Sequence, residues 1–333
     1  MINVQHTVTV LGAGSWGTAL ALLLAKNGCK VHLWDRDEEH INSLREKRVN
    51  ARYLPNFPFP DRIVVYHELG ASIENVTDLM MAVPSHAFRE VFSKMLPHLS
   101  PAVRIAWGTK GLDVTHQLLH VVVQSLLSPS TPIAVLSGPS IAREVAAGLP
   151  TAISLASNNQ SFSQDLTRYL YNEYFRVYPS DDLIGVELCG AVKNVLAIAA
   201  GISDGMSLGA NARSALITRG LTEMGRLCQA LGGKQKTLLE LAGVGDLILT
   251  CTDDQSRNRR FGLALGKGLD RLRAEKDIGQ AVEGLYNAKQ VYALAKSQGV
   301  EMPITQQVYR ILYENVSSRA AVEALLQRVP KTS

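Results

Sequence analysis

Three glycines at positions 12, 14 and 17, in the run Gly-Ala-Gly-Ser-Trp-Gly, have a spacing that suits a phosphate-binding turn. In such a turn Gly12 permits the tight bend, Gly14 lets the main chain approach a pyrophosphate, and Gly17 lets helix and strand pack closely. A structural loop that needs only a flexible backbone could contain the same three glycines. The flanking residues therefore have to decide between the two interpretations.

The flanking residues predict a strand, a turn and a helix in that order. Residues 7–11 are short, β-branched and apolar, whereas residues 18–28 are helix formers that end at a glycine. A second apolar strand over 30–34 ends at Asp35, which lies 18 residues after Gly17 (35 − 17), near the roughly 20 expected for an acidic residue that meets a ribose. This context predicts a dinucleotide site with the pyrophosphate at the positive end of the helix.

Two further polar motifs directly follow apolar strands. Lys110 lies in Gly108-Thr109-Lys110-Gly111, and Ser140 ends the motif Ser137-Gly138-Pro139-Ser140. Each has a purely structural alternative: Lys110 as a surface lysine in a turn, and Ser140 as the cap of a helix predicted over 141–147. Because strand ends line the ligand edge of a sheet, both residues are equally placed to bind a ligand, and a helix start also attracts anions.

Lys193 stands next to Asn194 in an apolar run over residues 187–201. A lysine in such a helix either snorkels outward, which the pattern alone favours, or is held in a place of low dielectric constant. In the second case desolvation lowers its pKa, so that it can exchange a proton near neutral pH. Asn194 adds a polar neighbour that an ordinary core helix would not contain.

The last polar motifs are Gly243-Val244-Gly245-Asp246 and Ser256-Arg257-Asn258-Arg259-Arg260. Arginines that cluster in this way usually form a solvated face of a helix. Arg257 can instead grip a phosphate with two parallel hydrogen bonds, which a merely solvated face does not need.

The elements that must position these motifs alternate between strands and helices up to residue 180. Helices are predicted over 85–96 and 113–127, a proline-rich loop over 53–60, and further strands over 63–66, 78–83, 103–107, 133–136, 151–155 and 175–178. This alternation predicts a Rossmann-like, doubly wound and mostly parallel sheet.

From residue 181 onward helical periodicity dominates. We therefore expect an α/β dinucleotide-binding domain over 1–180, followed by an all-helical substrate-binding and catalytic domain over 181–333. Ligands of open α/β sheets bind beyond the carboxyl ends of the strands, so the substrate is expected there, in a cleft that faces the helical domain.

Composition argues against several classes of function. The net charge of +4 in 333 residues is slight, which does not favour a nucleic-acid-binding surface. The four cysteines form no C-x-x-C pair, so neither a metal site nor a disulfide framework is predicted, and a reducing cytoplasm is the expected compartment. No secretory leader is recognised, and residues 188–202 are too few for a membrane span and are predicted to form a buried helix.

With these motifs in place, the chain resembles the bacterial type of the NAD(P)-dependent glycerol-3-phosphate dehydrogenases. The motifs at 12–17, 108–111, 137–140, 193–194, 243–246 and 256–259, and Val282-Glu283-Gly284, occur in the family's order and rough spacing. The resemblance implies reversible reduction of dihydroxyacetone phosphate to sn-glycerol 3-phosphate with NADH or NADPH, which supplies glycerophospholipid synthesis. It also implies a homodimer formed through the helical domain.

The resemblance further implies roles for individual residues. Lys193 matches the catalytic lysine that donates or accepts the proton, and Arg257 matches the group that holds the substrate phosphate. The implied substrate-binding residues are Lys110, Gly138, Ser140, Lys193, Asp246, Ser256, Arg257 and Asn258. The implied cofactor-binding residues are Gly12, Gly14, Ser15, Trp16, Gly17, Arg36, Lys110, Ala142, Arg257 and Glu283.

Two points stay open in the sequence. Asp35 suits the ribose 2′-hydroxyl of NAD, whereas Arg36 suits the 2′-phosphate of NADP, and bacterial members commonly carry a neutral residue in place of Asp35. We therefore predict that both cofactors are used. Asp246 is expected either to hydrogen-bond a substrate hydroxyl or to orient Lys193.

Two other functions fit the same fold. A dehydrogenase of the 3-hydroxyisobutyrate or 6-phosphogluconate kind also combines a dinucleotide domain with a catalytic lysine in a helix, but a non-phosphorylated acid does not require Arg257. A non-catalytic NAD(P)H-binding sensor would bind the cofactor without turnover. All of the motifs in this chain are intact, which does not favour the loss of catalysis.

Overall fold

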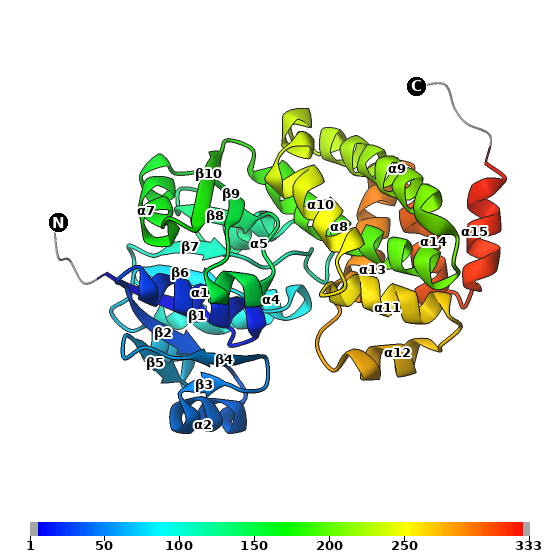
Figure 1. Ribbon diagram of the computed structural model, residues 1–333. Helices are drawn as coiled ribbons and strands as arrows, with labels where there is room; N and C mark the ends of the chain where they lie inside the picture. Colours follow the sequence, from blue (N-terminus) through cyan, green and yellow to red (C-terminus); the bar gives the residue numbers. More distant parts are fainter. Residues whose placement is uncertain (1–5, 329–333) are drawn as a thin grey trace. The chain divides into compact units, whose positions relative to one another are not determined.

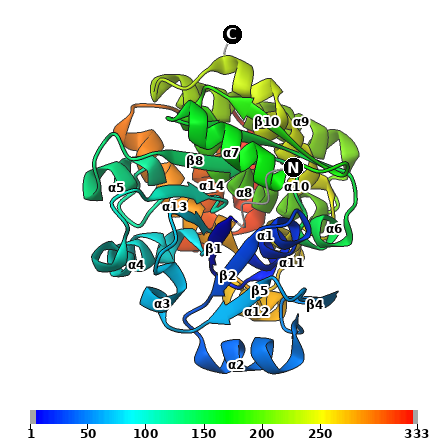
Figure 2. The ribbon, with the colours of Figure 1, turned by 90° about the vertical axis from the view of Figure 1, so that its left-hand side faces the viewer.

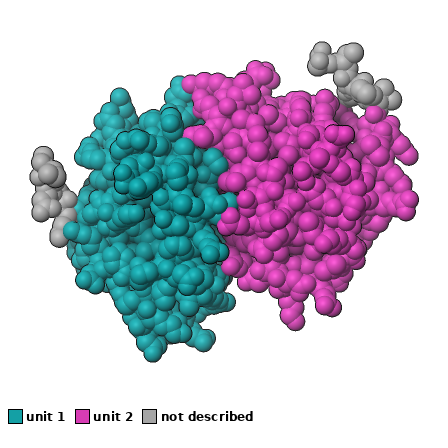
Figure 3. Space-filling view, viewed as in Figure 1, with its two compact units in different colours: residues 1–109, 119–186 teal, residues 110–118, 187–333 magenta. Residues whose placement is uncertain are grey.

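The computed structural model describes residues 6–328, which form two compact units (Figure 3). The sheet unit consists of the residues up to 109 and of residues 119–186, and the helical unit consists of residues 110–118 and the residues from 187 onward. Segment 110–118 thus belongs to the helical unit, although the residues on both sides of it in sequence belong to the sheet unit. Lys110 therefore lies in the same unit as Lys193.

An eight-stranded sheet forms the centre of the sheet unit (Figure 1). Its order is β10-β9-β8-β7-β6-β1-β2-β5, and every neighbouring pair is parallel except β8 and β9. The strand order runs outward in both directions from the β1–β6 pair, which confirms the predicted doubly wound sheet. The strands are β1 (Thr7–Leu11), β2 (Lys30–Trp34), β5 (Ile63–Tyr66), β6 (Asp78–Met81), β7 (Arg104–Trp107), β8 (Ile133–Ser137), β9 (Thr151–Ser157) and β10 (Phe175–Ser180).

Helices cover both faces of this sheet (Figure 2). One face carries α1 (Ser15–Lys26), α6 (Ala142–Ala147) and α7 (Gln160–Leu170), and the other carries α3 (Leu69–Ile73), α4 (Ser85–Met95) and α5 (Leu119–Leu126). A further helix, α2 (Glu38–Lys47), packs beside β5, and a 3-10 turn (Leu96–His98) follows α4. Because both faces are covered, the central strands β1, β6 and β7 are buried at nearly every position, unlike strands that have one face in solvent.

Two of the predicted elements are wrong. The segment predicted to be a proline-rich loop contains β4 (Leu54–Pro58), which pairs antiparallel with β3 (Val49–Asn50). Proline is tolerated there because β4 has only one neighbouring strand and needs few main-chain donors. The helix predicted from residue 113 begins only at α5, because Asp113 Oδ1 accepts hydrogen bonds from the main-chain N–H of Thr115 and of Gln117 and so stabilises a turn.

The helical unit contains no strand among its described residues, which confirms the predicted all-helical character. Its longest helix, α8 (Leu183–Gly205), starts in the sheet unit and continues into the helical unit. The other helices are α9 (Gly209–Ala230), α10 (Asp246–Thr252), α11 (Arg257–Gly266), α12 (Arg271–Ile278), α13 (Glu283–Ser297), α14 (Pro303–Tyr313) and α15 (Ser318–Leu326), with a 3-10 helix (Gln235–Leu239) and a π-helical turn (Leu241–Gly245) before α10.

Helix α8 is long and apolar enough to cross a membrane by length and composition alone, and it is the only such helix among residues 6–328. However, 89% of its most apolar window is buried inside the protein, so α8 is a core helix, as predicted for residues 188–202. The four cysteines are all buried and make no disulfide.

Glycines let α8 and α11 approach each other closely. A Cβ atom added at Gly201 of α8 would lie 2.1 Å from a main-chain oxygen of α11, and one added at Gly262 of α11 would lie 2.1 Å from a main-chain oxygen of α8. No larger residue fits at either position without moving a helix. This approach brings Asn194 of α8 within hydrogen-bonding distance of Asn258 of α11, 2.8 Å from Oδ1 to Nδ2.

Candidate active site

The glycine turn after β1 has the geometry that a dinucleotide turn requires. Gly12 has a φ of 106°, which favours glycine, and a Cβ atom at Gly17 would lie 1.9 Å from the Gly12 carbonyl oxygen. A Cβ atom at Gly14 would meet no other atom within 4 Å, so the main chain is open to a ligand at that residue. Gly14 is also the N-cap of α1 and offers its first turn no side-chain cap, an arrangement that fits a bound pyrophosphate.

Parallel strands bring several of the predicted residues to the same edge of the sheet. The strands β1, β2, β7 and β8 end directly before Gly12, Asp35, Gly108 and Gly138. Trp16 in the glycine turn packs against Gly108, where a Cβ atom would lie 2.3 Å from the indole Nε1, so only glycine fits. Two more of the predicted residues of this unit, Ser15 and Ala142, are the first residues of helices α1 and α6.

Asp35 stabilises the glycine turn through hydrogen bonds to main-chain N–H groups. Its Oδ2 accepts a hydrogen bond from the main-chain N–H of Ala13 at 2.8 Å, and its Oδ1 accepts one from the N–H of Asp37 at 3.1 Å. Both oxygens therefore already have a protein partner. Arg36, the next residue, is exposed at the same strand end.

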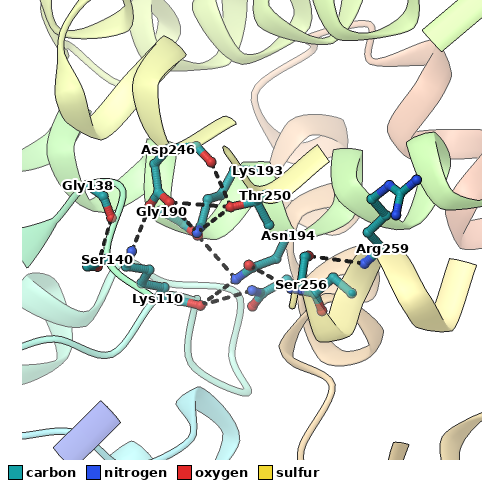
Figure 4. Close-up of polar contacts among 12 residues, drawn as sticks. Lys110, Gly138, Ser140, Gly190, Lys193, Asn194, Asp246, Thr250, Ser256 and Arg259 are labelled. Atoms are coloured by element: carbon teal, nitrogen blue, oxygen red, sulfur yellow. Dashed lines mark hydrogen bonds and ion pairs between the residues drawn. The ribbon is translucent and has the colours of Figure 1, made fainter. Parts of the chain in front are cut away.

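Ser140 does not cap α6. The N-cap residue of α6 is Ile141, and the Ser140 hydroxyl donates instead to the carbonyl oxygen of Gly138 at 2.9 Å (Figure 4). The interpretation of Ser140 as a helix cap is therefore wrong. Gly138 has a φ of 142°, and a Cβ atom there would lie 3.0 Å from the Cα atom of Ile153 in β9.

Lys193 is buried, so the snorkelling that the pattern alone favoured is wrong. Its side chain is only 8% exposed, and its Nζ donates to Asp246 Oδ1 at 2.6 Å and to Thr250 Oγ1 at 2.8 Å (Figure 4). Burial lowers the pKa of Lys193 to about 8, and the neighbouring Lys110 ammonium adds to this effect, whereas the Asp246 carboxylate opposes it. The ammonium is therefore placed to exchange its proton near neutral pH.

Asp246 joins two lysines. Its Oδ2 accepts from Lys110 Nζ at 2.7 Å, while its Oδ1 accepts from Lys193. Burial alone would raise the pKa of Asp246, but the two ammonium groups outweigh it and hold the pKa below its ordinary value. Counted by themselves, these three side chains carry two positive charges and one negative charge, an excess that suits an anionic ligand.

Local geometry explains how Asp246 reaches this place. Gly243 has non-helical dihedral angles (φ −87°, ψ −105°), and a Cβ atom there would lie 2.3 Å from the carbonyl oxygen of Leu238. This glycine kink lies inside the π-helical turn and sets the direction in which α10 starts after Gly245. Thr250 lies four residues after Asp246 on the same face of α10, which places both beside Lys193.

A series of buried asparagine amides connects α8, α11 and α13. Asn194 donates through Nδ2 to the carbonyl oxygen of Lys110 at 3.0 Å and accepts through Oδ1 from Asn258. Asn258 in turn accepts through Oδ1 from the main-chain N–H of Gly284 at 2.9 Å. Both polar atoms of Asn258, a predicted substrate ligand, therefore already have protein partners.

The arginine segment is only partly a solvated face. Ser256 caps α11 by accepting from the N–H of Arg259, which is itself buried and pairs with Asp204 at 2.7 Å. Arg257 opens α11 and donates to Gln280 Oε1 at 3.4 Å. Burial lowers the pKa of Arg257, while Glu283 at the start of α13 opposes this effect. An arginine nevertheless stays protonated in proteins, so this group remains a cation.

Sequence reasoning missed two residues of this cluster. Thr250 could have been found from its spacing, because a hydroxyl four residues after Asp246 in a helix must lie on the same face. Asn287 donates to the carbonyl oxygen of Lys110 at 3.1 Å, yet nothing in the local sequence of α13 indicates this contact. Among residues 6–328 no group of three or more His, Cys, Asp or Glu residues is arranged to hold a metal ion.

Comparisons with known proteins agree with the resemblance in sequence. Residues 7–163 match the N-terminal part of the NAD-dependent glycerol-3-phosphate dehydrogenases, and residues 182–323 match their C-terminal part. The chain is 60% identical over 327 residues to a glycerol-3-phosphate dehydrogenase [NAD(P)+] from Coxiella burnetii, with 98% of each chain covered.

Solved structures show the same similarity. A crystal structure of glycerol-3-phosphate dehydrogenase from Coxiella burnetii superposes with a TM-score of 0.96 and covers 97% of this chain and 99% of that one, at 60% identity. The corresponding enzyme from Saccharomyces cerevisiae gives a TM-score of 0.82 at 28% identity, with 97% of this chain and 99% of that one covered.

Proposed function

This chain belongs to the NAD(P)-dependent glycerol-3-phosphate dehydrogenase family, and from this premise we propose that Lys193 donates the proton when dihydroxyacetone phosphate is reduced to sn-glycerol 3-phosphate. The chain has the glycerol-3-phosphate dehydrogenase activity of the family, with NAD(P) as the cofactor. We further propose that the product supplies glycerophospholipid synthesis in the cytoplasm.

The observation that carries the proposal is the buried contact of Lys193 with Asp246. An ammonium has three protons, and Asp246 and Thr250 accept two of them, which leaves one for a substrate oxygen. The bound nicotinamide supplies the hydride. Negative charge that develops on the C2 oxygen is stabilised by the net positive charge of the cluster, and Lys193 then protonates that oxygen. In the reverse direction neutral Lys193 accepts the proton.

We assign the substrate phosphate to the start of α11. A 10-residue helix that begins with a capped first turn and an arginine presents both a positive dipole end and a guanidinium to an anion. The phosphate held by Arg257 orients the ketone, so binding energy is converted into positioning. Gly138 and Ser140 are assigned to the substrate from the sheet unit, and Asp246 acts by orienting the two lysines.

We propose that residues from each of the two units bind the cofactor. The glycine turn with Ser15 and Trp16, together with Arg36 and Ala142, would hold the dinucleotide in the sheet unit, where the open space at Gly14 and the uncapped start of α1 support the assignment. Lys110, Arg257 and Glu283 would contribute from the helical unit. We accordingly propose a dinucleotide-binding domain over 1–180 and a substrate-binding and catalytic domain over 181–333.

We expect the purified protein to oxidise NADPH rapidly with dihydroxyacetone phosphate and at least about tenfold more slowly, in kcat/KM, with unphosphorylated dihydroxyacetone. The factor follows from the loss of hydrogen bonds to a charged group, worth about 1.5–3 kcal/mol. Absorbance of the reduced cofactor measures both rates. Equal rates would contradict the proposed binding of the substrate phosphate by Arg257. Cofactor binding without any turnover would favour another hydroxyacid substrate or a non-catalytic sensor.

We expect both NADPH and NADH to support the reaction, with kcat/KM values within about a thousandfold of each other. Asp35 is held by the glycine turn and still has lone pairs for a ribose hydroxyl, while Arg36 is exposed for a 2′-phosphate. Steady-state rates with each cofactor test this expectation. Arg36→Ala should lower kcat/KM for NADPH about tenfold or more and leave that for NADH nearly unchanged; an equal loss with both would contradict this role.

We also propose a homodimer formed through the helical unit. The first half of α9, residues 209–219, contains no buried residue, which is unusual for half of a 22-residue helix. Leu239 and Ile248, on elements that contact α9, are exposed as well. Sedimentation equilibrium should give twice the mass of one chain, and the double substitution of Leu239 and Ile248 by glutamate should reduce it to one. A monomeric wild type would contradict this proposal.

A further inference from the structure

Asn287 of α13 is buried within the helical unit and contacts two segments of the reaction cluster. It is 0% exposed, and its Nδ2 donates to the carbonyl oxygen of Lys110 at 3.1 Å and to that of Ala191 at 3.4 Å. Ala191 precedes Lys193 by two residues on α8. A single amide therefore joins the Lys110 segment to the helix that carries Lys193.

The main chain at Lys110 is held by two such amides. Its carbonyl oxygen accepts from Asn194 at 3.0 Å as well as from Asn287, and its side chain reaches Asp246 Oδ2 at 2.7 Å (Figure 4). Lys110 is the first residue of a segment that leaves the sheet unit for the helical unit. The two hydrogen bonds therefore define where the Lys110 side chain starts, and hence how its ammonium meets the carboxylate.

The acceptor side of the Asn287 amide is unsatisfied. Its Oδ1 is buried and has no hydrogen-bond partner among residues 6–328. A buried polar atom without a partner costs about 1–3 kcal/mol, whereas an apolar residue of the same shape avoids the cost. Stability therefore does not explain an asparagine at this position, and the requirement must come from the two N–H groups that it presents.

Packing makes the contact rigid. A Cβ atom at Gly284, one turn before Asn287, would lie 2.6 Å from the carbonyl oxygen of Asn194, so the start of α13 is pressed against α8. This close approach restrains the main chain of α13 beside α8, and with it the point from which the Asn287 side chain starts. Such a restrained donor is suited to fix a neighbouring main chain.

We propose that Asn287 is a positioning residue for the reaction: its amide holds the carbonyl group of Lys110 and so keeps the Lys110 ammonium on Asp246, beside Lys193. The inference rests on the proposed function of Lys193. When the amide is lost, Lys110 moves from Asp246, and the carboxylate then acts on Lys193 alone. The pKa of Lys193 rises as a result, because its repulsion by Lys110 weakens and its attraction to Asp246 strengthens.

The test compares Asn287→Leu with Gln290→Leu. Leucine removes the donor and keeps the number and branching of the side-chain heavy atoms, and Gln290 is a matched control because it lies three residues further along α13, is buried, and also has an unsatisfied amide oxygen. For oxidation of sn-glycerol 3-phosphate, Asn287→Leu should lower kcat about 3- to 10-fold, the worth of one hydrogen bond. The pH at which the rate rises should move upward by about half a unit or more, while Gln290→Leu keeps the wild-type profile.

A double-mutant cycle with Lys110→Met separates positioning from a merely structural role. Without the ammonium, Asn287→Leu should produce little further loss of kcat and no further shift of the pH profile. The same fold loss in both backgrounds would overturn the proposal, because Asn287 would then act independently of Lys110. If Asn287→Leu does not fold, Asn287→Ala provides the same comparison without added bulk.

Failure of the inference is distinguishable from failure of the proposed function. If Lys193→Ala keeps its activity, the proposed function fails whatever the Asn287 variants do. If Lys193→Ala is inactive and Asn287→Leu behaves like Gln290→Leu in rate and pH profile, only the role of Asn287 is overturned.

Discussion

Replacing Lys193 by alanine should lower kcat by about 100- to 10,000-fold, the range that general acid–base catalysis contributes. The substitution removes the buried ammonium that protonates the C2 oxygen, whereas the glycine turn and Arg36, the proposed cofactor ligands of the sheet unit, are unaltered. The dissociation constant of NADPH should therefore remain nearly unchanged. Steady-state rates at saturating dihydroxyacetone phosphate and a fluorescence titration with NADPH measure the two quantities.

The pH dependence of the wild type gives the same role a second test. Reduction requires protonated Lys193, so its rate should fall as the pH rises through about 8, whereas oxidation requires neutral Lys193 and should speed up through the same pH. The exposed Lys289 provides a matched control, and Lys289→Ala should keep both the rate and the profile. A loss of less than about tenfold for Lys193→Ala would remove Lys193 from the proton transfer.

Replacing Asp246 by asparagine should destabilise the helical unit by about 3–5 kcal/mol, the usual cost of removing one partner from a buried ion pair. The reason is that the ammonium groups of Lys110 and Lys193 would both lose the buried carboxylate of Asp246 as a partner. Equilibrium unfolding in urea measures the loss. Asp277→Asn is the matched control, because Asp277 is exposed, and its effect should stay within about 0.5 kcal/mol.

The same substitution should alter the kinetics in a defined direction. Without the carboxylate the pKa of Lys193 falls further, because burial and the charge of Lys110 are then unopposed. At neutral pH fewer molecules hold the proton needed for reduction, so the rate of reduction should fall and its inflection should move to lower pH. Unchanged unfolding together with an unchanged pH profile would show that Asp246 does not control Lys193.

Agreement between sequence and structure is best where a signal is local. The strand, glycine turn and helix over residues 7–26 could be predicted because apolar periodicity and glycine conformation depend on near neighbours. The helix predicted from 113 failed because the Asp113 side chain competes for main-chain donors within four residues. The strand at 54–58 was missed because proline excludes a residue from the interior of a sheet, but not from a two-stranded ribbon.

The sequence by itself determined the order of the elements and the residue types at each strand end, since these follow from short-range pattern. Only the tertiary structure decided which polar groups meet: Asp246 pairs with Lys110 across 136 residues and with Lys193 across 53. Whether Lys193 snorkels or is buried depends on the helices that pack around α8, including the close approach at Gly201 and Gly262. Its lowered pKa is therefore a property of the folded helical unit, because desolvation and neighbouring charges exist only there.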